Sequence, residues 1–267
     1  MLLAIDCGNT NIVFTLFEAQ TKLSEWRLET VSRRPADEYF IALCHVLESQ
    51  KLHYTDIKNC ILASVVPVVT HHLVRFCEER LAVTPMVVGE EGVKLNLDVQ
   101  TDEPAQVGAD RLVNAVAVAA AGDVPAIILD FGTATTFDVV RPAAPDSDGS
   151  AIYAGGVIAP GVHRSVEALV AAAAKLPSLA VENFDPDLPV LGTSTQSAMK
   201  SGVLWGYVGL IDGLLNRLKA EPGMAEAVVI GTGGLASLFA PHIDAIDKVD
   251  NALTMTGLRI IFNRNKG

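Results

Sequence analysis

The sequence predicts an α/β protein built from two lobes of related structure. Short apolar strands alternate with helices of about 10–15 residues, a pattern typical of sheets with partly parallel strands. A turn with an aspartate and a glycine, flanked by two strands, occurs at Asp6 and again at Asp130. These aspartates lie 124 positions apart in a chain of 267 residues, close to half its length, which indicates an internal duplication. With 50% hydrophobic residues, the chain has ample material for a substantial core.

Apolar spacing places the elements of the first half. Short apolar runs predict most of the strands, alternation predicts the strand over 24–30, and apolar residues three and four positions apart predict helices. The expected elements are a hairpin of strands 2–5 and 12–17, a strand over 24–30, a helix over 37–50, a strand over 60–66, a helix over 68–81, a strand over 85–89 and a helix over 109–121.

The second half starts with a copy of the hairpin. The expected elements are this hairpin over 126–140, an exposed loop over 142–150, a glycine-rich segment 155–161 leading into a helix, a long helix over 195–219 capped by Ser194 or Thr195, a strand, glycine turn and helix over 227–239, and a last helix over 256–263. We expect the lobes to comprise residues 1–118 and 119–267, with the last helix a candidate to pack back on the first lobe.

The charge balance limits the class of partner. With 20 Lys and Arg against 31 Asp and Glu, the net charge is −11, which argues against a nucleic-acid-binding protein. Small phosphorylated ligands remain possible, because backbone amides and a divalent ion can hold them. No signal peptide, membrane-spanning stretch or C-x-x-C pair is found, and the four cysteines are expected in the core. We therefore expect a soluble, cytoplasmic protein with no membrane partner.

The first candidate site is the turn Asp6-Cys7-Gly8-Asn9-Thr10. Glycine lets the backbone approach a phosphate closely, and the turn amides with the Asn and Thr side chains offer donors to phosphate oxygens. The Asp6 carboxylate cannot donate, so its natural role is to hold Mg²⁺ on those oxygens. The alternative is an ordinary hairpin turn, for which these residue types are also usual.

The second candidate is the copy of this turn in the other half, Asp130-Phe-Gly132-Thr133-Ala-Thr-Thr. Two phosphate-binding turns facing one another would form a cleft for a nucleotide. The third candidate, Gly231-Thr-Gly-Gly234, fits a dinucleotide fingerprint, but only 33 residues follow it, too few for such a domain. We expect a nucleotide base or ribose to rest on these glycines.

The fourth candidate is Gly108-Ala109-Asp110-Arg111 at the start of a predicted helix. Asp110 could act as a base toward a substrate hydroxyl, with Arg111 binding an anionic group. A helix cap with a surface ion pair explains the same residues equally well. A P-loop, the protein-kinase motif set, a nucleophile elbow and a zinc-binding pattern are all missing from the sequence.

Together, six motifs resemble the type III pantothenate kinase family. They are D-C-G-N-T-N-I-V at 6–13, G-A-D-R at 108–111, D-F-G-T-A-T-T at 130–136, G-G-V-I-A-P-G at 155–161, T-S-T-Q-S-A-M-K-S-G at 193–202 and G-T-G-G at 231–234. The resemblance implies the two-lobed fold of acetate and sugar kinases, Hsp70 and actin, with duplicated ribonuclease H-like lobes and ATP in the cleft between them. It also implies ATP-dependent phosphorylation of pantothenate, the first step of coenzyme A synthesis, by a homodimer that uses Mg²⁺ and K⁺ or NH₄⁺.

The resemblance also implies roles for individual residues. Asp130 would bind the monovalent cation, Thr133 would contact ATP, and Asp110 would accept the proton of pantothenate. The remaining implied ATP contacts are Asp6, Cys7, Gly8, Asn9, Thr10, Asn11, Ile12 and Val13, and the other implied pantothenate contacts are Gly108, Ala109, Arg111 and Thr195.

One position departs from the family pattern. Seven residues before Gly108, related enzymes often carry a tyrosine that lines the substrate pocket, whereas this chain has Thr101. Two other functions stay open at this stage. The first is an accessory protein that kept the fold and lost the reaction, and the second is a kinase of another hydroxylated molecule such as a sugar.

Overall fold

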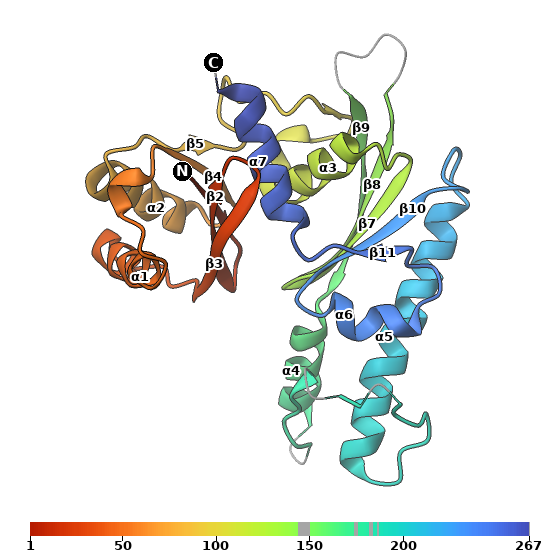
Figure 1. Cartoon of the computed structure of the whole chain (residues 1–267). Coiled ribbons are helices and arrows are strands. Elements are labelled where there is room, and N and C mark those ends of the chain that lie inside the picture. Colours follow the sequence, from red (N-terminus) through yellow and green to blue (C-terminus); the bar gives the residue numbers. More distant parts are fainter. Residues whose placement is uncertain (144–149, 174–175, 182–183, 186, 267) are drawn as a thin grey trace. The chain divides into compact units, whose positions relative to one another are not determined.

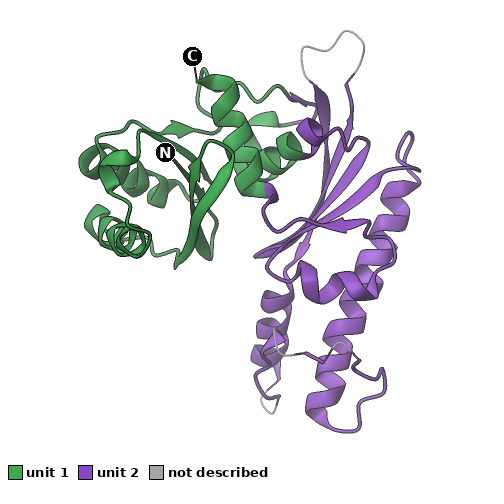
Figure 2. Ribbon diagram, viewed as in Figure 1, with its two compact units in different colours: residues 1–96, 103–117, 254–267 green, residues 97–102, 118–253 purple. Residues whose placement is uncertain are grey.

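The structure is a computed structural model that describes residues 1–143, 150–173, 176–181, 184–185 and 187–266. The predicted loop over 142–150 therefore lies largely outside the described residues. Two compact units divide the chain (Figure 2). Unit 1 comprises Met1–Asn96, Glu103–Ala117 and Thr254–Gly267, and unit 2 comprises Leu97–Asp102 and Val118–Leu253.

Unit 1 is built on a five-stranded sheet with the strand order β3-β2-β1-β4-β5 (Figure 1). The strands are β1 (Leu2–Cys7), β2 (Asn11–Glu18), β3 (Thr21–Glu29), β4 (Asn59–Ser64) and β5 (Met86–Val87). β1 pairs antiparallel with β2 and parallel with β4, with Cys7 opposite both Ile12 and Ser64. The carboxyl ends of β1 and β4 therefore lie side by side, next to the first turn.

Helices complete unit 1. They are α1 (Ala36–Ser49), α2 (Pro67–Leu81), the first nine residues of α3 (Ala109–Ala121) and α7 (Leu253–Asn265), with short 3-10 turns at Tyr54–Asp56 and Pro104–Gln106. Alternate residues of β1, such as Leu3 and Ile5, form one buried cluster with apolar side chains of α1 and α2. On α7, Gly257 lies so close to α3 that a Cβ there would be 2.2 Å from the carbonyl oxygen of Val113.

Unit 2 repeats the same topology. Its strands are β6 (Asp98–Val99), β7 (Ala126–Phe131), β8 (Ala134–Pro142), β9 (Ala151–Pro160), β10 (Val228–Gly233) and β11 (Lys248–Val249), in the order β11-β10-β7-β8-β9-β6. The strand order β9-β8-β7-β10-β11 in unit 2 matches the order β3-β2-β1-β4-β5 in unit 1. Each pair of neighbouring strands is also parallel or antiparallel in the same way in both units. The predicted duplication is therefore present as two copies of one sheet.

The helices of unit 2 are α4 (Val162–Ala172), α5 (Thr195–Lys219) and α6 (Ala236–Phe239), followed by a 3-10 turn at Ala240–His242. Apolar residues of β7 and β8, among them Leu129 and Phe137, pack with these helices in one buried cluster. α5 begins with a capping box in which the Ser194 hydroxyl accepts the backbone N–H of Ser197. No helix among the described residues is both long and apolar enough to cross a membrane.

Segment 155–161 leads into a helix as predicted, since α4 starts directly after Gly161. The prediction did not include a strand here, whereas residues 155–160 form the second half of β9. Gly155 adopts a φ of +94°, and the pairing of β8 with β9 changes register between Asp138 and Val140. Two adjacent glycines and an irregular register conceal the alternation by which strands are normally found.

Candidate active site

The first turn connects β1 to β2 through three residues. The backbone N–H of Gly8 donates to the carbonyl oxygen of Asn11 at 3.0 Å, and a Cβ on Gly8 would lie 3.3 Å from the same oxygen. Asn9 and Thr10 are exposed, whereas Cys7 and Ile12 are buried on either side of the turn. The turn is thus anchored in the core at both ends and exposes the polar residues Asn9 and Thr10.

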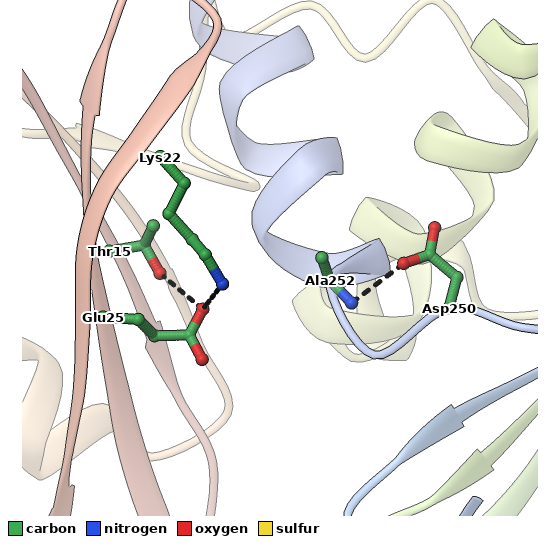
Figure 3. A network of polar contacts seen from close by, with 5 residues as sticks. All are labelled: Thr15, Lys22, Glu25, Asp250 and Ala252. Atoms are coloured by element: carbon green, nitrogen blue, oxygen red, sulfur yellow. Dashed lines mark hydrogen bonds and ion pairs between the residues drawn. The ribbon is translucent and has the colours of Figure 1, made fainter. Parts of the chain in front are cut away.

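The chain after β3 closes over this turn. Thr30 donates its backbone N–H to the carbonyl oxygen of Thr10 at 2.9 Å. A side-chain cluster ties β2 to β3 further along: the buried Thr15 hydroxyl donates to Glu25, which also accepts from Lys22 at 3.2 Å (Figure 3). Since β3 leads directly into the segment that carries Thr30, these bonds help to fix the position of that segment.

Asp110 lies in the first helical turn of α3. This part of α3 belongs to unit 1, as does the turn between β1 and β2. Its carboxylate oxygen Oδ1 accepts the backbone N–H of Arg111 at 2.8 Å. A Cβ on Gly108 would be 2.5 Å from that oxygen and 3.5 Å from Val65. Val65 follows β4 and donates its N–H to the carbonyl oxygen of Cys7 at 3.1 Å. The 108–111 segment therefore packs on Val65, which is bonded directly to Cys7 at the start of the first turn.

The environment of Asp110 changes its acidity. Burial raises the pKa of this carboxyl above its ordinary value, while the backbone N–H and the guanidinium of Arg111 lower it by a smaller amount. A raised pKa increases the affinity of a carboxylate for a proton, which suits a group that accepts one during a reaction.

The second turn, in unit 2, is held by two glycines from distant segments. A Cβ on Gly161 would lie 2.1 Å from the carbonyl oxygen of Thr133. A Cβ on Gly233 would lie 2.4 Å from the Asp130 carboxylate, and Gly233 has a φ of +88°. Three motifs found separately in the sequence, at 130–136, 155–161 and 231–234, therefore meet at this turn. Gly233 packs closely on Asp130, whereas a Cβ on Gly234 would meet open space.

Thr195 lies elsewhere in unit 2, at the start of α5. It is exposed and lines a cavity of about 560 Å³ between α4 and α5. The other lining residues are Ser165, Leu169, Leu176, Ala198, Met199, Gly202, Val203 and Tyr207. The Tyr207 hydroxyl donates to the carbonyl oxygen of Pro160 at 2.9 Å. This bond joins the wall of the cavity to the end of β9, directly before the residue that packs on Thr133.

Each of the two turns contributes one aspartate carboxylate, which alone does not make a complete metal-binding site. Among the described residues, no three His, Cys, Asp or Glu side chains form a group that could hold a metal ion. In phosphoryl-transfer sites, Mg²⁺ is usually held by one or two carboxylates together with the phosphates of the substrate. One carboxylate at Asp6 and another at Asp130 are compatible with ions that bind together with a nucleotide.

Thr101 follows β6 in unit 2. Its hydroxyl is buried and has no hydrogen-bond partner within the described parts of the chain. A Cβ on Gly155 would be 3.7 Å from its methyl group, so Thr101 packs against the irregular part of β9.

Comparison with known proteins defines the class first. A solved protein from Sinorhizobium meliloti described as a 2-dehydro-3-deoxygalactonokinase superimposes with a TM-score of 0.52 at 13% identity, over 99% of this chain and 96% of the other. A Campylobacter jejuni protein described as a Baf family transcriptional activator gives 0.60 at 18% identity, covering 98% of both chains. The fold is that of acetate and sugar kinases, Hsp70 and actin.

Sequence comparison then gives the family. A family model described as type III pantothenate kinase matches residues 2–217. The type III pantothenate kinase of Rhodospirillum centenum is 48% identical over 268 residues, covering 99% of this chain and 99% of the relative. This chain belongs to the type III pantothenate kinase family, which confirms the resemblance inferred from the motifs.

Two parts of the candidate site have no distinctive signal in the sequence. Thr30 follows a strand, and a threonine there matches no motif. Gly161 belongs to a glycine-rich motif, but its contact with Thr133 joins residues 28 positions apart in the chain.

Proposed function

We propose that this chain transfers the γ-phosphate of ATP to the primary hydroxyl of pantothenate, forming 4′-phosphopantothenate, the first step of coenzyme A biosynthesis. Family membership supports this reaction. The observation that carries the site assignment is the position of the partly buried Asp110 carboxyl, whose raised pKa accompanies packing through Gly108 and Val65 against the first turn. The proposed base and the proposed phosphate-binding turn thus lie at the same end of the sheet in unit 1.

In this proposal Asp110 is the general base. Its carboxylate accepts the proton of the pantothenate hydroxyl as that oxygen attacks the γ-phosphorus. The Arg111 N–H on Oδ1 fixes the orientation of the carboxylate. A positioned base of this kind is typically worth about 10²–10⁴ in rate.

The first turn is assigned to the ATP phosphates. The exposed Asn9 and Thr10 side chains and the backbone of residues 8–11 are the proposed phosphate contacts, and Thr133 is the proposed ATP contact in the second turn. The chain has a net charge of −11, so additional cations are needed to offset the negative phosphates. Asp6 is the proposed ligand of Mg²⁺ and Asp130 that of K⁺ or NH₄⁺; bound there, these ions would neutralise charge on the phosphate oxygens.

Pantothenate is assigned to the 108–111 segment and to Thr195. Arg111 suits the carboxylate of pantothenate, because a guanidinium matches a carboxylate with two parallel hydrogen bonds. We also propose that the protein is a cytoplasmic homodimer, as is typical of the family. Light scattering on the purified protein tests the dimer.

A coupled assay of ADP release tests the function, with pantothenate beside a panel of sugars as acceptors. We expect ADP release when pantothenate is the acceptor and none when a sugar is the acceptor. Turnover with a sugar instead would keep the fold and the use of ATP but change the acceptor. No ADP release with any acceptor, from folded protein supplied with Mg²⁺ and K⁺, would favour an accessory protein that has lost the reaction.

A further inference from the structure

Arg34 carries a buried positive charge that the proposed reaction does not yet use. It lies between β3 and α1, and its side chain is only 16% exposed. The guanidinium nitrogen Nη1 is buried and has no hydrogen-bond partner among the residues that the structure describes. A buried donor left without an acceptor costs free energy, and the cost is larger for a charged group.

The neighbours of Arg34 offset its charge only in part. Its Nε lies 3.4 Å from Glu38, whose side chain is 60% exposed, and ion pairs with exposed carboxylates contribute little. The guanidinium carbon lies 5.7 Å from the centre of the Tyr39 ring. Neither contact provides an oxygen acceptor for Nη1. The Tyr39 hydroxyl is itself buried without a partner in the described structure.

The segment that carries Arg34 is bound to the first turn. Thr30 bonds to the carbonyl oxygens of Gly8 and Thr10, and the N–H of Arg34 donates to Val31 at 3.1 Å, which folds residues 31–34 back on themselves. Arg34 thus lies four residues after the residue that closes the turn.

Tyr39 provides a second link between Arg34 and the turn. It shares one buried cluster with Cys7, the residue that enters the turn. Burial raises the pKa of Tyr39 to about 12, while the nearby Arg34 guanidinium lowers it and Cys7 raises it further. Arg34 and Cys7 therefore both lie within electrostatic reach of the same hydroxyl.

We propose that Arg34 is a further phosphate-binding residue, whose Nη1 donates to an anionic phosphate oxygen held at the first turn. This inference rests on the proposed function, because it takes the triphosphate of ATP as the ligand. An arginine suits the role, since its guanidinium stays charged and can present two donors to one phosphate. In a chain with a net charge of −11, a largely buried cation in the segment bonded to the first turn suits the role of offsetting phosphate charge. The competing explanation is that Arg34 only anchors the start of α1.

Calorimetric titration of the full-length protein with MgATP, inorganic triphosphate with Mg²⁺, and adenosine tests this assignment. Arg34→Gln is expected to weaken binding of both phosphate ligands about 10- to 100-fold and to leave the affinity for adenosine unchanged. The matched control is Arg75→Gln, which removes an exposed arginine paired with Glu79 on α2 of the same unit. It should bind all three ligands as the unaltered protein does.

The outcomes separate the alternatives. An equal loss of affinity for all three ligands, or a loss no larger than that of Arg75→Gln, would overturn the assignment. Should Arg34→Gln not fold, Arg34→Lys keeps the charge and loses the planar fork. It should weaken MgATP binding about 3- to 10-fold, and unchanged affinity in that variant would overturn the assignment equally. If the unaltered protein binds no MgATP, the proposed function itself fails.

Discussion

The side-chain hydroxyl of Thr30 donates a hydrogen bond of 2.7 Å to the carbonyl oxygen of Gly8. This bond joins the residue that follows β3 to the first residue of the turn between β1 and β2. Because a glycine turn has little side-chain packing of its own, its shape depends on such bonds from outside. The first turn, to which we assign the ATP phosphates, is therefore held in part by Thr30, which lies outside its motif.

Thr30→Val tests this support. Valine keeps the shape of the side chain and removes the hydroxyl, so the Gly8 carbonyl loses one donor. We expect the free energy of unfolding to fall by about 1 kcal/mol and the affinity for MgATP to fall about 2- to 10-fold. Urea unfolding and calorimetric titration measure the two effects. Thr21→Val, at the exposed start of β3, is the control and should change neither.

Asp110→Asn tests the general base. Turnover should fall by about 10²–10⁴ while MgATP still binds. In the unaltered enzyme, the raised pKa of Asp110 should place the acidic limb of the kcat/KM profile above the ordinary aspartate pKa of about 3.9, and the variant should lack that limb. Asp37→Asn, in the exposed first turn of α1, is the control. Near-normal turnover of Asp110→Asn would remove Asp110 from the role.

The same substitution should stabilise the fold. The pKa of Asp110 is raised mainly by burial. Folding therefore costs free energy when this carboxyl is charged, and the cost disappears when the carboxyl is protonated. The stability of the unaltered protein should therefore decline as the pH rises from the unfolded pKa through the raised folded pKa. Asp110→Asn should unfold at a higher temperature at pH 7, and the difference should shrink toward pH 3. Equal melting temperatures across this range would contradict the burial effect.

Gly233 and Gly234 form a matched pair for testing the second turn. At Gly233, alanine would need an unfavourable φ and would clash with Asp130 and the backbone of Phe131. We expect Gly233→Ala to lower the free energy of unfolding by at least about 2 kcal/mol. Gly234→Ala meets open space and should fold normally. Denaturant unfolding of both variants provides the measurement, and equal stabilities would show that the contact with Asp130 is dispensable.

Exchange of monovalent cations tests Asp130. If its carboxylate holds K⁺ or NH₄⁺, replacing these ions by Na⁺ should depress the turnover of the unaltered protein. Asp130→Asn should have low turnover that no longer depends on the cation. Steady-state assays in the three chloride salts at constant ionic strength measure this. Equal turnover of the unaltered protein in all three salts would refute the assignment.

The duplicated hairpins and the fold class could be predicted because their signals are local. Asp6 and Asp130 each stand between a short apolar strand and a glycine turn, and the two sheets that result share one strand order. Asp110 could likewise be placed at a helix start, where α3 begins at Ala109.

The contacts that shape the turns could not be predicted, because they join residues far apart in the chain. Nothing near Gly233 in the sequence indicates that it packs on Asp130, 103 positions earlier. β9 was missed because its paired glycines suggest a loop, and pairing with β8 overrides that local preference. The buried state of Arg34 could not be predicted either, since an arginine in a polar segment is normally exposed.

The last helix has a consequence for how the protein is made. Asn265 on α7 bonds to the backbone of Lys94, and Thr254 bonds to Asn114 at 2.8 Å, so unit 1 includes residues from three separate stretches of the chain. A ribosome that has translated the first 253 residues has produced all of unit 2 but has not yet supplied α7. Unit 1 can therefore reach its final packing only late in synthesis, and expressing residues 1–117 as a separate fragment should leave the surface that α7 covers open to aggregation.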